Sequence, residues 1–238
     1  ADAPLDAAGR SALVAHAAEW FMDRLHPLQP RMDDEDWFPR EAYGDLARMG
    51  FLGLTVAPEW GGQGLDYLTA GMIAEAMAMA NPALAFSWVS HDNLCLNSLY
   101  RNGTDAQRAR YVPAMCRGEM IGALAMTEPE AGSDALGSMR TRARREGQHY
   151  VLDGRKIYIT NGPVADVLIV YAKTSPEPGS RGISAFVVER GLPGFGSGLA
   201  WVAGRRRLRR NRFVLGEAFA DPDLLDVEFD EFFLEPLH

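Results

Sequence analysis

The chain has 238 residues, 47% of them hydrophobic, and a formal net charge of −8 at pH 7. This length supports a buried core and allows two subdomains, while the negative charge argues against general binding to nucleic-acid phosphates. No apolar run is long enough to span a bilayer, and the first ten residues lack a basic segment followed by an apolar one. The composition therefore predicts a globular protein without membrane insertion or a secretory signal.

The first half of the chain predicts helices, because its apolar residues recur at helical spacing. Capping residues and breakers mark the ends of several of them: Asn81 precedes Pro82, Thr104 and Gln107 form a capping box, and Gly50 ends a helix. The glycines and proline of PEWGGQGLDY predict a loop. The helices expected are 11–25, 39–49, 68–79, one that starts at Asn81, and one from Thr104 to Met115.

Beyond Gly118 the hydrophobic period changes from that of a helix to that of a strand. The stretch YVLDGRKIYITNG alternates apolar and polar residues around Asp153-Gly154, a dipeptide typical of hairpin turns. The runs ADVLIVYAKT and GISAFVVER are further β-rich segments. We therefore expect a helical domain over 1–120, an antiparallel β domain over 121–198, and a divergent tail over 199–238.

Two segments of the predicted β domain carry polar groups suited to ligand binding. MTEPEAGSD, residues 126–134, follows an apolar run and offers hydroxyls and bare backbone N–H groups that suit a heterocycle edge or a phosphate. KIYITNG, residues 156–162, is expected to be a strand with Tyr158 and Thr160 on one face and Asn161 at its polar end. An ordinary turn explains either segment alone, but together they favour a site for a flat polar ring.

Several motifs in order resemble the flavin-dependent acyl-CoA dehydrogenases. They are GLTVAPEWGGQGLDY, ALAMTEPEAGSD, LDGRKIYITNGPVADVLIVYAKT, RGISAFVVE and PGF, and SHDNLCLNSLYRNGT is most similar to the isovaleryl-CoA dehydrogenase branch. The resemblance runs from about residue 20 to 195. It implies an α+β fold, with an N-terminal all-α domain and an antiparallel β-barrel-like middle domain, and without the C-terminal helical bundle of the family.

The resemblance implies FAD as the cofactor. It assigns to the flavin site Leu124, Ala125, Met126, Thr127, Gly132, Ser133, Tyr158, Ile159 and Thr160. In this match Thr127 hydrogen-bonds the ring, Ser133 serves the acyl-CoA or the FAD phosphates, and the Thr160 hydroxyl reaches flavin N5. Tyr158 stands where the family usually has tryptophan. Ser180 and Arg181 match a pair that contacts the CoA part of the substrate, and a guanidinium suits phosphate.

The implied reaction is α,β-dehydrogenation of a short branched-chain acyl-CoA such as isovaleryl-CoA, a step of leucine catabolism. The resemblance places the catalytic base on a glutamate of the C-terminal bundle, so no catalytic residue is predicted within this chain. It also implies an electron-transfer flavoprotein as electron acceptor, a homotetramer in the full-length family, and a location in the bacterial cytoplasm or the mitochondrial matrix. The alternative is a non-catalytic remnant that binds acyl-CoA or flavin weakly.

After LPGFGS the family pattern stops, and RRRLRRNR at 205–212 follows in an otherwise acidic chain. A frameshift or truncation, a solvated surface and a phosphate-binding patch all remain open for this tail.

Other candidate groups are assigned structural roles. His91-Asp92 has no nucleophile motif near it, and Glu128 and Glu130 are expected to shape their loop. Cys95 and Cys116 lack metal-ligand spacing, so they are expected to be reduced core thiols and no metal site is predicted.

Overall fold

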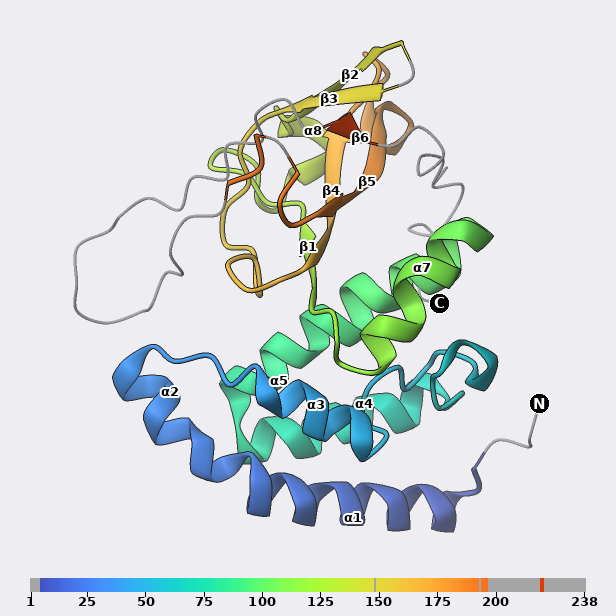
Figure 1. The fold of residues 1–238 in the computed structure, drawn as a ribbon, viewed down its shortest axis with the longest axis vertical. Coiled ribbons are helices and arrows are strands. Elements are labelled where there is room, and N and C mark those ends of the chain that lie inside the picture. Colours follow the sequence, from blue (N-terminus) through green and yellow to red (C-terminus); the bar gives the residue numbers. More distant parts are fainter. Residues whose placement is uncertain (1–4, 148, 193, 197–218, 221–238) are drawn as a thin grey trace. The chain divides into compact units, whose positions relative to one another are not determined.

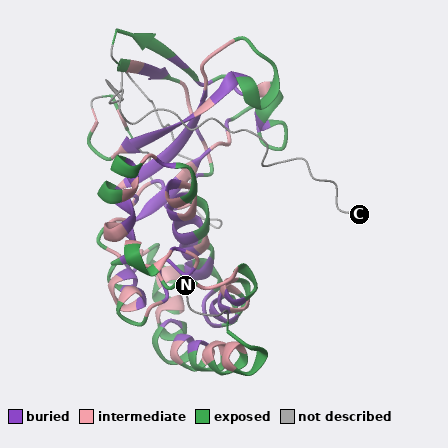
Figure 2. Ribbon diagram, turned by 90° about the vertical axis from the view of Figure 1, so that its right-hand side faces the viewer, coloured by how far each residue is buried: buried purple, intermediate pink, exposed green. Residues whose placement is uncertain are grey.

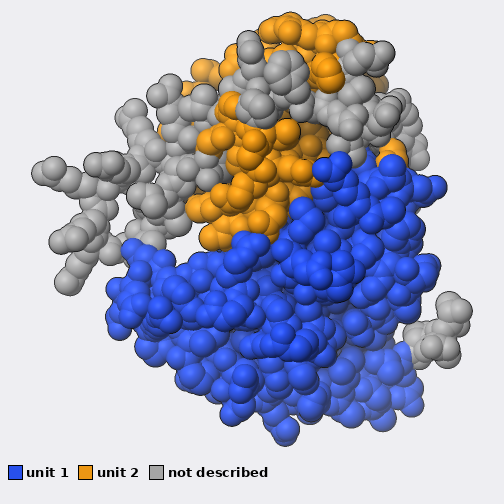
Figure 3. Space-filling model, in the orientation of Figure 1, with its two compact units in different colours: residues 1–101, 105–122 blue, residues 102–104, 123–238 orange. Residues whose placement is uncertain are grey.

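The computed structural model describes residues 5–147, 149–192 and 194–196, and the backbone of 219–220. The chain divides into two compact units (Figure 3), a helical unit of residues 1–101 and 105–122 and a β unit of residues 102–104 and 123–238. The tail expected over 199–238 lies outside the described residues, apart from the backbone of 219–220. This tail includes the arginine-dense segment at 205–212.

The helical unit contains seven α-helices in its described part (Figure 1), and short 3₁₀ turns and one π-helical segment connect them. No helix in the described part of the chain combines the length and apolarity needed to cross a bilayer. The helices are α1 (Ala7–Arg24), α2 (Gln29–Glu35), α3 (Glu41–Arg48), α4 (Tyr67–Ala80), α5 (Pro82–Val89), α6 (Asn97–Asn102) and α7 (Asp105–Cys116).

Side-chain caps start the main helices, because an oxygen just before a helix can accept an otherwise unpaired backbone N–H. Asp6 accepts from Gly9 N at 2.7 Å at the start of α1. Asn81 accepts from Leu84 N at 3.0 Å, with Pro82 in the first position of α5. The predicted Asn81 cap is thus confirmed, and so are the predicted helices, although α1 begins four residues earlier than expected.

The core of the helical unit is formed by the inward faces of α1, α3, α4 and α5, which Figure 2 shows as buried stripes. Phe21, Tyr43, Phe51 and Trp88 are all at most 2% exposed, and α1 lies against α4. Such burial contributes roughly 1.5–3 kcal/mol for each large apolar side chain.

Both described cysteines are buried and free, which confirms the prediction for Cys95 and Cys116.

His91 and Asp92 lie in a buried π-helical segment, Ser90–Leu96, and both bind backbone groups of the helical unit. His91 Nδ1 accepts from Gly122 N at 3.0 Å. Asp92 Oδ1 accepts from Gly53 N at 2.5 Å, and Oδ2 accepts from Leu54 N at 3.4 Å. These contacts give the pair a packing role, in agreement with the structural assignment from the sequence.

Asp92 is expected to make the stability of the helical unit depend on pH. Burial raises the pKa of its carboxyl from 3.8 to about 7, against the opposing effect of the hydrogen bonds from Gly53 and Leu54. The carboxyl of Asp92 therefore stays protonated in the folded state up to about pH 7, whereas in the unfolded chain it releases its proton near pH 4. The tighter proton binding favours the folded state at low pH, and this stability is lost as the pH rises through about 7. We expect the free energy of unfolding to fall between about pH 4 and pH 7, and Asp92→Asn to flatten that slope.

The measurement is urea unfolding at several pH values followed by tryptophan fluorescence, since Trp20, Trp37, Trp60 and Trp88 lie in the helical unit. Asp66→Asn is the control. Hydrogen bonds from Thr69 lower the pKa of Asp66 to about 2, so that group titrates below the tested range. An Asp92→Asn protein that keeps the slope of the parent chain would contradict the assignment.

The β unit is built on a sheet with strand order β1-β4-β2-β3-β6, and β5 pairs with β4. The strands β2 and β4 pair in parallel, with Arg142 opposite Lys173, so the sheet is mixed and the predicted antiparallel architecture is wrong in this respect. The reason is that an irregular stretch separates β3 from β4, which lets β4 return beside β2. The unit contains β1 (Gly122–Ala125), α8 (Ala135–Ser138), β2 (Arg142–Glu146), β3 (His149–Asp153), β4 (Val167–Lys173), β5 (Ile183–Glu189) and β6 (Phe219–Ala220).

The hairpin predicted at Asp153-Gly154 is wrong. The turn lies between Glu146 and His149, where Gly147 has a φ of 65°, and Asp153 is the last residue of β3. Gly154 does not have a left-handed backbone. An added Cβ would lie 2.6 Å from the Cα of Thr141, so the glycine is required for close approach rather than for a turn.

Candidate functional site

The first predicted binding segment leaves the sheet immediately after β1. The strand ends at Ala125, so Met126 and Thr127 lie just beyond it, and a tight loop follows. Glu128 N donates to Ala131 O at 2.9 Å, and Ala131 N donates to Glu128 O at 3.2 Å. Leu124 and Ala125 belong to the strand, whereas Gly132 and Ser133 are exposed. Residues 126–134 therefore form the polar turn after β1, and the expectation that this segment is itself the first strand, with Thr127 at its end, is wrong.

The second predicted segment, residues 156–162, lies outside the strands. Tyr158 and Asn161 have φ values of 56° and 64°, and a strand cannot continue through two left-handed residues so close together. The prediction of a strand with Tyr158 and Thr160 on one face is therefore wrong. The turn leaves the Tyr158 side chain largely exposed, with 72% of the residue accessible, while Ile159 is buried.

A backbone hydrogen bond and a buried ion pair join the two segments. Ile157 N donates to Thr127 O at 2.9 Å. Lys156 Nζ lies 2.8 Å from Glu128 Oε1 and also donates to Met126 O at 3.0 Å. The side chains of Lys156 and Glu128 are only 1% and 3% exposed. The predicted flavin segments are thus neighbours in space although they are separated in sequence.

Sequence reasoning did not identify Lys156. The available signal was a lysine placed directly before the apolar run of KIYITNG, because a buried lysine requires a partner. Its acidic partner is 28 residues earlier in the chain. No local pattern connects residues at that separation.

The environment of Glu128 keeps its carboxylate charged. Burial raises its pKa, but the hydrogen bonds from Lys156, Thr141 and Arg140 outweigh that effect, so the pKa is lowered overall. Arg140 N donates to Oε2 at 2.5 Å, and Thr141 N donates to Oε1 at 3.0 Å. Glu128 therefore shapes the loop, as predicted.

Glu130, two residues later, is exposed and pairs with Arg140 at 3.0 Å. Exposed ion pairs of this kind contribute little to stability.

A third segment carries Ser180 and Arg181, the residues predicted to contact the CoA part of the substrate. It forms the 3₁₀ turn Gly179–Gly182 before β5. Ser180 and Arg181 are exposed there, and Arg181 Nε lies 3.6 Å from Glu177 Oε2. The turn contacts α8, and Lys173 Nζ at the end of β4 donates to Gly137 O of α8 at 3.2 Å. Since α8 directly follows the loop that carries Gly132 and Ser133, it connects the first and third segments.

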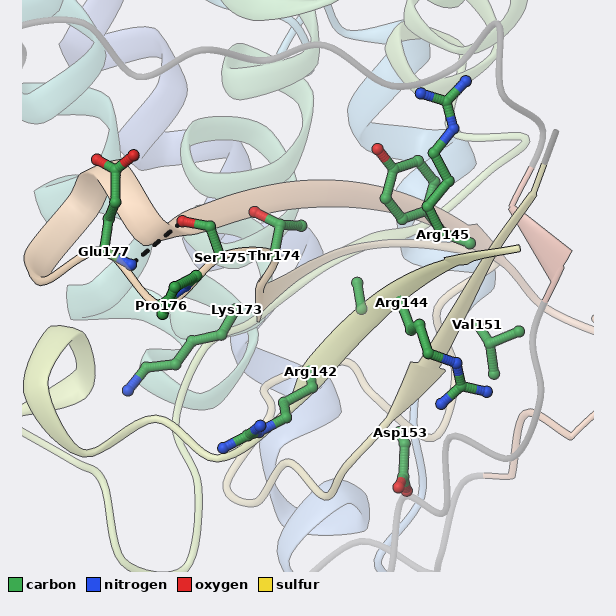
Figure 4. A pocket seen from close by; sticks show the side chains of 12 residues that line it. Arg142, Arg144, Arg145, Val151, Asp153, Lys173, Thr174, Ser175, Pro176 and Glu177 are labelled. Carbon is green, nitrogen blue, oxygen red and sulfur yellow. Dashed lines mark hydrogen bonds between the residues drawn. The ribbon is translucent and has the colours of Figure 1, made fainter. Parts of the chain in front are cut away.

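A cavity of about 780 Å³ opens elsewhere in the β unit, between β2, β3 and the chain after β4 (Figure 4). Its lining is rich in cations from Arg142, Arg144, Arg145 and Lys173. None of the predicted flavin residues is among the described residues that line this cavity. The cavity therefore lies outside the flavin segments, although its lining includes Glu177, which pairs with Arg181.

Family models match most of the chain. The model of the acyl-CoA dehydrogenase N-terminal domain matches residues 9–119, and that of the middle domain matches residues 123–216. These spans include every residue predicted to bind flavin or substrate.

Individual proteins give the same result. Mitochondrial isovaleryl-CoA dehydrogenase of Pongo abelii is 47% identical over 182 residues, which are 75% of this chain and 43% of that protein. The solved structure of an acyl-CoA dehydrogenase from Geobacillus kaustophilus has a TM-score of 0.83 at 29% identity and covers 94% of this chain and 59% of that one. The FAD complex of PigA has a TM-score of 0.82 at 31% identity and the same coverage. The chain spans about half the length of these proteins, and it belongs to the acyl-CoA dehydrogenase family.

Proposed function

We propose that this chain provides the flavin-binding part of an FAD-dependent dehydrogenase of short branched-chain acyl-CoA thioesters, such as isovaleryl-CoA. One observation supports this most strongly. The segments around Thr127 and Thr160, matched to the two flavin segments from the sequence, are joined through Ile157 and a buried ion pair. The identity with isovaleryl-CoA dehydrogenases supports the choice of substrate.

The residues of this site fit FAD. Threonine hydroxyls and loop backbone offer hydrogen bonds to the polar edge of a flavin ring, and Tyr158 presents an exposed aromatic side chain beside Thr160. The surroundings of Gly132 are open, since an added Cβ would meet no atom within 4 Å. A phosphate or pyrophosphate can therefore approach the backbone of this loop closely.

In this proposal the residues of the chain bind and orient the flavin and the thioester substrate. When bound, FAD would supply the acceptor for the hydride that leaves the β-carbon of the thioester. Thr127 and Thr160 would hold the ring, and Ser133, Ser180 and Arg181 would bind the CoA or phosphate part of the ligands. Glu128 is held by Lys156 and by two backbone N–H groups, so we assign it no proton transfer.

The partners and the location follow from the same proposal. The proposed acceptor of the electrons is an electron-transfer flavoprotein, and the proposed assembly of the full-length protein is a homotetramer. Relatives named as mitochondrial support the mitochondrial matrix if the source is eukaryotic, and the cytoplasm is proposed if it is bacterial.

The test is titration of FAD into the purified 238-residue chain, followed by flavin fluorescence and absorbance. We expect saturable but weak binding. Thr160→Ala should reduce the affinity by roughly 0.5–1.5 kcal/mol, the usual contribution of one hydrogen bond. Thr174→Ala is the matched control, because Thr174 bonds Ser184 at 2.9 Å outside the flavin segments. Absence of saturable binding would contradict the function, and equal affinity for the Thr160→Ala protein would remove Thr160 from the site.

A further inference from the structure

The Glu128–Lys156 ion pair holds three stretches of backbone together. Glu128 Oε1 accepts from Lys156 Nζ and from Thr141 N, and Oε2 accepts from Arg140 N. Lys156 Nζ also donates to Met126 O. The pair therefore connects the loop after β1, the start of β2 and the irregular stretch after β3.

The stretch after β3 is irregular near the ion pair. It makes no ladder pairing beyond Gly154, and the left-handed residues Tyr158 and Asn161 interrupt regular structure. Ile157 N donates to Thr127 O and so connects this stretch to the first segment. A turn of this kind takes one conformation only where the surrounding structure fixes it.

A buried ion pair is well suited to fix such a conformation. Burying two charges is costly, so the pair adds little stability compared with a packed apolar pair, but separating its partners leaves a buried charge without a counterion. Any arrangement that moves 156–160 away from 126–128 is therefore strongly disfavoured. The pair selects one relative placement of the two segments.

We propose that Glu128 and Lys156 are positioning residues, whose buried ion pair sets the loop of Met126–Thr127 against the turn of Tyr158–Thr160. The consequence for flavin rests on the proposed function. The placement of the two segments is independent of it. Because a ring-binding site requires its hydrogen-bonding groups to be fixed before the ligand arrives, loss of the pair should weaken FAD binding through loss of this placement.

Amide hydrogen exchange with mass spectrometry tests the placement without any ligand. In Lys156→Met we expect peptides covering 126–134 and 156–162 to exchange at least tenfold faster, while β4 and β5 change less than twofold. Lys173→Met is the matched control, since Lys173 is half-buried in the same unit and its Nζ donates to Gly137 O. It should leave both segments unchanged. If Lys156→Met does not fold, Lys156→Gln, which keeps a donor for Met126 O, replaces it with the same expectation.

Equal exchange in the two segments of the variant and the parent chain would overturn the proposal. So would equal acceleration across β4 and β5, because the pair would then support the whole unit rather than this placement. FAD affinity is the second readout, with an expected loss of at least tenfold in Lys156→Met and less than twofold in Lys173→Met. If the parent chain does not bind FAD but exchange accelerates selectively, the proposed function fails and the positioning role stands.

Discussion

The 238-residue chain by itself is expected to show no acyl-CoA dehydrogenase turnover above background, even with FAD added. The reaction requires a base to remove the proton next to the thioester carbonyl, and general base catalysis typically contributes 10²–10⁴-fold. The three carboxylates of residues 126–134 are all engaged, and Asp134 accepts from Gly137 N and Ser138 Oγ at the start of α8. Glu128 is buried in its ion pair with a lowered pKa, and Glu130 pairs with Arg140.

The measurement is turnover of isovaleryl-CoA with an artificial electron acceptor. It compares the chain with a version extended by the C-terminal domain of a close relative. We expect activity in the extended form alone, because the family resemblance places the base in that domain. Substantial turnover by the 238-residue chain would contradict this, and substitution of Glu217, Glu228 and Glu231 by glutamine would then identify the base.

Gly154→Ala is expected to destabilise the β unit by roughly 1–3 kcal/mol, as overpacked sites usually do. The new Cβ would lie 2.6 Å from Thr141 Cα and closer still to the Thr141 hydroxyl. Thr141 cannot move away at little cost. Its N–H is bound to Glu128, and its carbonyl accepts from Lys173 N at 2.9 Å.

Differential scanning calorimetry of the whole chain measures this loss. Gly71→Ala is the matched control, because Gly71 lies inside α4 and its added Cβ would meet nothing within 4 Å. That change should leave stability equal or slightly raised, since alanine is the better helix former. If the two variants unfold at the same temperature, the close approach at Thr141 does not limit the packing there.

The sequence alone determined the parts of this protein that depend on local patterns. Helices followed from apolar spacing and from caps such as Asn81-Pro82, because those signals act within one or two turns. The strands β4 and β5 followed from continuous β-branched and aromatic runs. The family followed from motifs that are themselves local, including the segments around Thr127 and Thr160.

Only the tertiary structure decided how distant segments meet. The parallel pairing of Arg142 with Lys173, the close approach of Gly154 to Thr141 and the ion pair of Glu128 with Lys156 join residues far apart in sequence. Asp-Gly predicts a turn because its usual role is local, but at Asp153-Gly154 the close approach of Thr141, just before β2, leaves no room for a side chain. Whether a charged side chain is buried, and therefore needs a partner, depends on all the segments that surround it. No local sequence pattern encodes this.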